Sequence, residues 1–205
     1  MQKDSFLTFS KVSEGVFKDK GSRFLAFGHN VKNEDEVKQI INQYKKRFYD
    51  ARHHCYAYRF GLFEDKYRMN DDGEPSGTAG KPIFGQIQSN ELYNSLIVVV
   101  RYFGGTLLGT SGLINAYKLA SADCIANASL REEILTKRLK IEFPYDLTNE
   151  VMRVIKDTEA KPGEQFYDKN CTMEIAVRLN NFNNLRDRLA KLHQINFLKE
   201  ENNKE

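Results

Sequence analysis

The sequence predicts an α+β protein with two domains, residues 1–134 and 135–205. Before residue 135, apolar side chains recur first at strand spacing and then at helical spacing, with two glycine-rich loops between the elements. After residue 134 the expected order is β-α-β-β-α-β, which is the order of a ferredoxin-like fold. A chain of 205 residues can form one large domain or two small ones, and the self-sufficient second pattern favours two.

The N-terminal domain begins with strands. Residues 5–31 alternate apolar and polar positions around glycine turns, which predicts a strand pair. Asn33 can cap the next helix, with Glu36 three residues later in a capping-box position. The later elements expected are a strand at 56–60, a short helix with Pro82 first, a central strand at 95–102 buried on both faces, and a long helix capped by Thr110 or Ser111.

The C-terminal domain repeats a simpler pattern. Leu139, Ile141 and Phe143 alternate as a strand, and a helix over 147–158 follows. We expect a hairpin that turns near Lys169-Asn170. A helix beginning near Phe182 and a short final strand complete the predicted ferredoxin-like sheet.

Composition restricts the class of protein. The chain is 40% hydrophobic and 29% charged, with a net charge of +3, so it gives only weak support for nucleic-acid binding. Three cysteines without a CxxC pair argue against a disulfide framework and a structural zinc site. No apolar run approaches the ~18 residues of a membrane span. We therefore expect a cytoplasmic protein that binds no metal, cofactor or membrane.

The two glycine-rich loops are the expected binding site. Each precedes a helix, whose first N–H groups and partial positive charge face whatever lies in front. If both helices leave the same end of the sheet, loops 71–81 and 103–111 meet, with Arg101 at the floor and His54 near the wall. Such a site suits an anion. The candidate binding residues are His54, Asp71, Asp72, Gly77, Thr78, Gly80, Lys81, Arg101, Gly104, Gly105, Thr110 and Ser111.

Simpler explanations of these residues stay open. The glycines fail the P-loop and dinucleotide spacings and can serve only to permit tight turns. Asp71 and Asp72 can bond their own turn, and either can pair with Arg101, which could alternatively hold a ligand phosphate. His53 and His54 point to opposite faces of a strand, so they cannot share one metal ion.

Both loops closely resemble signature stretches of the IMPACT/YigZ family, as do Lys20–Phe24 and the run Asp50–Tyr58 (DARHHCYAY). The resemblance implies an N-terminal two-layer α/β domain similar to folds of ribosomal proteins and translation factors. It also implies a small C-terminal domain similar to one from elongation factor G. The family's eukaryotic members resemble regulators of the amino-acid-starvation response.

The resemblance implies a non-enzymatic regulatory or binding protein associated with translation, whose glycine-rich loop surface meets a protein or RNA partner. The alternative is an enzyme for a phosphate or nucleotide ligand. In that case Arg101 and the loop amides hold the phosphate, and His54 or Asp72 transfers the proton. No set of nucleophile, base and orienting group is readable in the sequence, so no catalytic residue is assigned.

Overall fold

The computed structural model describes residues 3–62 and 66–202. The chain forms two compact units, Phe6–Glu133 and Ile134–Glu205 with Met1–Ser5. The first unit contains β1 (Ser5–Phe9), β2 (Ser13–Asp19), β3 (Ser22–Asn30), α1 (Glu34–Arg47), β4 (His53–Phe60), β5 (Lys66–Asn70), α2 (Gly80–Ser89), β6 (Ser95–Tyr102), α3 (Gly109–Ala126) and β7 (Leu130–Ile134).

A five-stranded antiparallel sheet forms the centre of this unit, in the order β2-β3-β6-β4-β5. β6 is the middle strand, as its continuous apolar run predicts. Near its end, Arg101 is paired with Phe24 of β3 on one side and with His53 of β4 on the other. This register brings the end of β6 to the start of β4.

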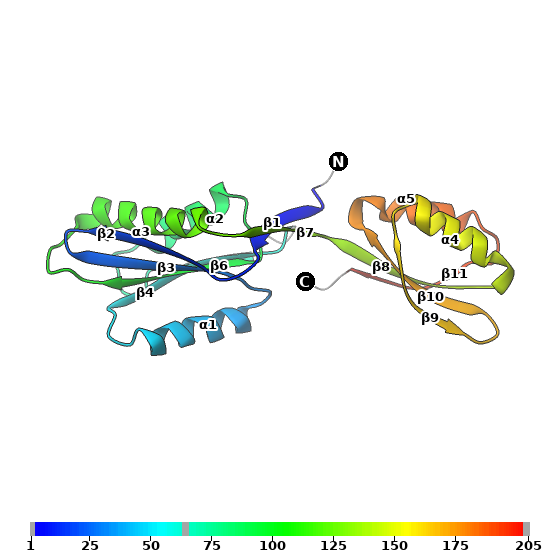
Figure 1. The fold of residues 1–205 in the computed structure, drawn as a ribbon, viewed down its shortest axis with the longest axis horizontal. Helices are drawn as coiled ribbons and strands as arrows, with labels where there is room; N and C mark the ends of the chain where they lie inside the picture. Colours follow the sequence, from blue (N-terminus) through cyan, green and yellow to red (C-terminus); the bar gives the residue numbers. More distant parts are fainter. Residues whose placement is uncertain (1–2, 63–65, 203–205) are drawn as a thin grey trace. The chain divides into compact units, whose positions relative to one another are not determined.

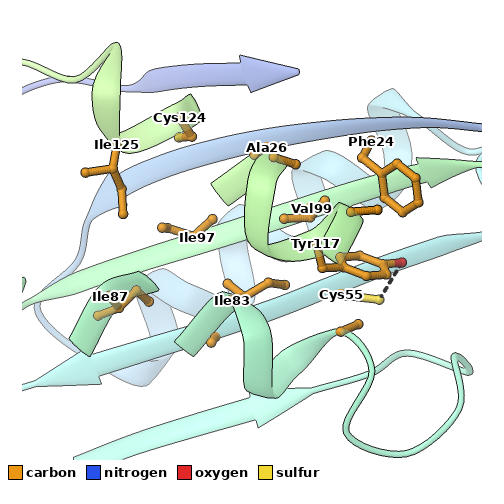
Figure 2. Packing of buried hydrophobic residues seen from close by; sticks show 14 of the residues in the cluster. Phe24, Ala26, Cys55, Ile83, Ile87, Ile97, Val99, Tyr117, Cys124 and Ile125 are labelled. Atoms are coloured by element: carbon orange, nitrogen blue, oxygen red, sulfur yellow. Dashed lines mark hydrogen bonds between the residues drawn. The ribbon is translucent and has the colours of Figure 1, made fainter. Parts of the chain in front are cut away.

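Helices cover both faces of the sheet (Figure 1). On one face, Ile97 and Val99 of β6 lie in a core with side chains of α2 and α3, including Ile83 and Tyr117 (Figure 2). On the other face, the alternate residues of β6 pack with α1. The α+β class is confirmed. The layer count differs from the two expected, because α1 adds a layer on the second face.

The start of α1 follows the sequence prediction. The Asn33 side chain accepts hydrogen bonds from the backbone N–H groups of Asp35 and Glu36. Glu36 Oε2 in turn accepts from the Lys32 backbone N–H at 2.8 Å. The Asn33 side chain therefore binds N–H groups that the helix leaves unpaired, and Glu36 binds the N–H of the residue that precedes the cap.

Other element boundaries differ from expectation. Residues 5–30 form three strands rather than a pair, because β1 joins β7 in a separate two-stranded sheet. Pro82 is the third residue of α2, which begins at Gly80. α3 begins at Gly109 and has no side-chain cap. Thr110 and Ser111 therefore do not cap it, because both already lie within its first turn.

The second unit has the ferredoxin-like arrangement that its element order predicts. It contains β8 (Thr136–Phe143), α4 (Thr148–Asp157), β9 (Lys161–Tyr167), β10 (Cys171–Arg178), α5 (Phe182–Ala190) and β11 (Asn196–Asn202). The sheet order is β11-β8-β10-β9. Alternate residues of β8 and β10 form one core with α4 and α5. None of the described helices is long and apolar enough to cross a membrane.

Candidate functional site

The two glycine-rich loops meet around a pocket of about 350 Å³ in the first unit. The first loop contributes residues 73–75, and the second contributes Phe103 and residues 107–110. The start of β4, the end of β6 and Leu113, one turn further along α3, complete the lining. The lining residues are Arg52, His53, Gly73, Glu74, Pro75, Arg101, Phe103, Leu107, Leu108, Gly109, Thr110 and Leu113.

A buried ion pair lies at this pocket. Arg101 Nη1 donates to Glu74 Oε1 at 2.6 Å, and the two side chains are only 6% and 3% exposed. The Tyr117 hydroxyl donates to the same Glu74 oxygen at 2.8 Å. Of the alternatives left open for Arg101, a pair with Asp71 or Asp72 does not occur, because both aspartates bind other donors.

Asp71 fills the first loop with its own carboxylate. Its Oδ1 accepts from the backbone N–H groups of Ala79 and Gly80 at 3.0 and 2.8 Å, and its Oδ2 accepts from Gly77 at 2.9 Å. These amides include the first ones of α2, where a negative charge is favourable. These three amides are therefore not available to a ligand, and of the alternatives left open for Asp71 the structure shows the one in which it bonds its own turn.

Asp72 fixes the start of β4. Its Oδ2 accepts from the His54 backbone N–H at 2.7 Å, and its Oδ1 accepts from Lys45 Nζ at 3.2 Å. His53 Nδ1 lies 2.8 Å from the Asp72 carbonyl oxygen. Because a carbonyl can only accept, Nδ1 bears the proton in this contact. His53 Nε2 then lies 3.9 Å from Glu74 Oε1.

His53, not His54, lines the pocket. His54 is buried on the opposite face of β4, where Nε2 lies 3.2 Å from the Phe48 carbonyl oxygen. Burial lowers its pKa below the ordinary value. The placement of His54 at the wall of the site is therefore wrong, because successive residues of a strand point to opposite faces.

Close packing explains two of the candidate glycines. A Cβ on Gly104 would lie 1.9 Å from the carbonyl carbon of Gly21, and a Cβ on Gly80 would lie 2.7 Å from the Asn70 nitrogen. Gly77 and Gly105 instead adopt positive φ angles of 76° and 87°, a conformation that glycine enters without steric cost. Gly80 and Gly104 are therefore required by packing, and Gly77 and Gly105 by backbone conformation.

The other candidates separate into those near the pocket and those away from it. Thr110 lines it, while Ser111 and Lys81 are exposed and do not. Thr78 is buried and donates to the Pro75 carbonyl oxygen at 2.6 Å, so its hydroxyl serves the turn. Thus Arg101 and Thr110 are the candidates that the structure places in the lining.

The buried thiol behind the pocket is not a reactive group. Cys55 Sγ lies 3.0 Å from the Asp71 carbonyl oxygen. It also lies 3.3 Å from the Tyr117 hydroxyl, the contact drawn as a dashed line in Figure 2. Burial raises the pKa of the Cys55 thiol strongly, which suppresses the thiolate. No cluster of three metal-ligating side chains occurs within residues 3–62 and 66–202.

The sequence interpretation missed Glu74 as the partner of Arg101 and His53 as a pocket residue. Strand alternation places His53 on the face of Cys55 and Ala57, but it does not show which face of the strand lies beside the loops. Leu107 was missed for a different reason. It is 82% exposed, and no pattern in an irregular loop predicts the exposure of a single apolar residue.

Comparison with known proteins identifies the family. Residues 20–125 match the Impact N-terminal domain. The chain is 31% identical over 173 residues to IMPACT family member YvyE of Bacillus subtilis (strain 168), covering 84% of this chain and 80% of YvyE. It is 41% identical over 100 residues to IMPACT family member YigZ of Escherichia coli (strain K12), covering 48% of this chain and 49% of YigZ.

The fold is also similar to a known structure along almost its whole length. A crystal structure described as that of a hypothetical protein matches with a TM-score of 0.69 and 25% identity, covering 96% of this chain and 97% of the other. The YvyE match likewise extends well beyond residues 20–125. The chain therefore belongs to the IMPACT family.

Proposed function

We propose that this chain is a non-enzymatic, translation-associated regulatory protein that binds a protein partner in the cytoplasm. The binding surface would be the pocket and its rim. The observation that supports it most directly is the exposure of Leu107 and Phe103, 82% and 41% respectively, beside the Arg101–Glu74 pair. Exposed apolar side chains next to a hollow are typical of interaction sites.

A protein partner fits this surface better than RNA. Aromatic and apolar side chains with arginine are the usual energetic centre of protein interfaces. RNA binding depends on many lysine and arginine contacts to phosphates. Here Arg101 is already paired with Glu74, Lys81 lies outside the pocket, and Asp71 occupies the first loop's amides.

The connection with translation rests on the family. The motifs of this chain resemble those of IMPACT proteins, whose eukaryotic members resemble regulators of the amino-acid-starvation response. The alternative of a phosphate- or nucleotide-directed enzyme loses one of its supports. It required free amides in the first loop, and these bind Asp71.

Site-specific photo-crosslinking in cells tests this proposal. A photoreactive amino acid replaces Leu107 in one variant and Tyr49 in a control variant, because Tyr49 is 85% exposed and does not line the pocket. We expect the probe at position 107 alone to join a protein of the translation apparatus, with or without ribonuclease treatment. A crosslink that ribonuclease removes would favour RNA. The same adduct from both positions, or none from position 107, would contradict the proposed surface.

A further inference from the structure

The two helices that follow the glycine-rich loops begin differently. α2 begins on the Asp71 carboxylate, which accepts hydrogen bonds from three backbone N–H groups of the loop and helix. α3 has no side-chain cap and no acidic residue in its first turn. Its first residues, Gly109 and Thr110, line the pocket. The start of α2 therefore faces a carboxylate of the protein itself. The start of α3 instead faces the pocket.

Arg101 provides a second, independent indication of a ligand. It lines the same pocket and is 5% exposed. Its Nη1 atom binds Glu74, but its Nε atom is buried and has no hydrogen-bond partner in the described part of the chain. A buried guanidinium donor without a partner is unfavourable by itself. An anionic group in the pocket would lie beside this guanidinium, because Arg101 lines the pocket wall.

The rest of the lining is mixed. Phe103, Leu107, Leu108 and Leu113 supply apolar side chains, and Arg52, His53 and Glu74 supply polar ones. Its volume of about 350 Å³ is at the low end of the range for ligand sites. A fitting ligand is therefore small, with an anionic group and an apolar group close together.

We propose that this pocket binds the carboxylate of a peptide's C-terminal residue, with its apolar side chain against Phe103, Leu107 and Leu113. The carboxylate lies at the start of α3 beside Arg101, as the Asp71 carboxylate lies at the start of α2. This assignment rests on the proposed function, since it names the part of the protein partner that enters the pocket.

A C-terminal residue satisfies both halves of the pocket. Its carboxylate and side chain are attached to the same carbon atom, so the anion and the apolar group are a few bonds apart. Capture of terminal carboxylates by backbone amides is a known mode of peptide recognition. A phosphate dianion fits less well, because Glu74 already neutralises part of the Arg101 charge and only Arg52 adds a further full positive charge to the lining.

A matched pair of probes tests the carboxylate directly. N-acetyl-leucine and N-acetyl-leucinamide differ only at the terminal group, and inorganic phosphate tests the competing anion. Each is titrated into the full-length protein while amide chemical shifts are followed by NMR. We expect N-acetyl-leucine to shift Gly109 and Thr110 and to bind at least tenfold more tightly than the amide. N-acetyl-alanyl-leucine should bind at least as tightly if the natural ligand is a peptide end.

Thr110→Asp supplies a variant that should fold well and lose the site. A carboxylate in the first turn of α3 is favourable to the helix but occupies and repels the position of the ligand. We expect the melting temperature to stay equal or rise while affinity for N-acetyl-leucine falls at least tenfold. Thr110→Asn is the neutral control and should change affinity less than threefold.

The outcomes separate this proposal from the proposed function. Equal binding of the acid and the amide, binding of phosphate alone, or no binding of N-acetyl-leucine would overturn the carboxylate site. Any of these results would leave the crosslinking result at position 107 intact. If N-acetyl-leucine binds as expected but position 107 yields no protein adduct, the pocket takes a free carboxylic acid and the partner surface is wrong.

Discussion

Glu74 Oε1 accepts hydrogen bonds from Arg101 Nη1 at 2.6 Å and from the Tyr117 hydroxyl at 2.8 Å. One carboxylate oxygen thus joins the first glycine-rich loop, the end of β6 and the middle of α3. All three side chains are buried, with Glu74 and Arg101 at the wall of the pocket. The position of the loop is therefore coupled to the packing of α3 on the sheet.

Removing one member of this pair should be strongly destabilising. Arg101→Met and Glu74→Leu each leave a buried charge without its partner, and we expect a loss of about 3–5 kcal/mol in the free energy of unfolding. The double variant removes both charges and should lose much less than the sum of the two. Urea unfolding monitored by circular dichroism measures all three, and additive losses would contradict coupling within the pair.

Asp71 should stabilise the first loop and α2 together. Asp71→Ala removes the acceptor of three backbone N–H groups, and we expect a loss of about 2–4 kcal/mol, because each bond to a charged acceptor is worth roughly 1.5–3 kcal/mol and the bonds are not fully additive. Asp35→Ala is the control, since that side chain is 84% exposed. A loss for Asp71→Ala no larger than for Asp35→Ala would mean that water replaces the carboxylate without cost.

The second unit should show a specific dependence on acid. Arg178 binds Asp4 at 2.7 and 2.8 Å, and this contact holds the pKa of Asp4 below its ordinary value of 3.8. The ionised carboxylate therefore stabilises the folded state above pH 4, and this contribution is lost as the pH falls through the lowered pKa. The effect concerns residue 4 together with residues 134–202, which belong to one unit.

Asp4→Asn should reveal this contribution. We expect the variant to be about 1–2 kcal/mol less stable at pH 7, since Arg178 is partly exposed. The difference from the natural protein should shrink below pH 4. Denaturation at a series of pH values from 2.5 to 7 measures it. A difference that stays constant over this range would show that ionisation of Asp4 is irrelevant.

Two glycines should respond oppositely to alanine. At Gly104 an added Cβ would overlap the backbone of Gly21, and we expect a loss of at least about 1–3 kcal/mol. At Gly85, inside α2, an added Cβ meets no atom within 4 Å, and alanine should stabilise the helix by about 0.5–1 kcal/mol. Thermal unfolding of both variants checks the pair. Similar effects at the two sites would exclude close packing as the reason for Gly104.

The two domains should be separable near residue 134. We expect limited proteolysis to cut first within residues 128–138 and to release the C-terminal part of the second unit, without residues 1–5, as a folded fragment. Cuts inside either unit, with none in that interval, would place the boundary elsewhere. The control is the same digestion in mild denaturant, where cuts throughout the chain replace the selective one.

Much of the fold was predictable because it depends on local patterns. The Asn33 cap, the central strand at Ser95–Tyr102 and the second unit's element order all follow from side-chain periodicity and turn chemistry. The site was harder, because its decisive contacts join residues far apart in the chain. Asp71 and Glu74 have similar chemistry and lie three residues apart, yet one binds amides and the other binds Arg101. Sequence spacing does not distinguish these two outcomes.

The sequence predicted that His53 and His54 lie on opposite faces of β4, but it did not predict which of the two lines the pocket. Alternation along β4 predicted that His53 and His54 face opposite ways, but only the packing of α1 against Phe27 and Tyr58 shows which face lies away from the loops. The sequence also did not predict that α3 lacks a side-chain cap. Thr110 and Ser111 look like capping residues, but the helix begins before either of them.

The pairing of β1 with β7 has a mechanical consequence. The Ser10 N–H donates to the Ser129 carbonyl and the Leu135 N–H donates to the Asp4 carbonyl, so the two strands are antiparallel. The chain therefore enters and leaves the first unit at the same end of one ladder. Tension applied between residues 5 and 134 would open this ladder one hydrogen bond at a time, as a zipper opens, rather than shearing all of its bonds at once. The five-stranded sheet would bear load only after β1 and β7 had separated.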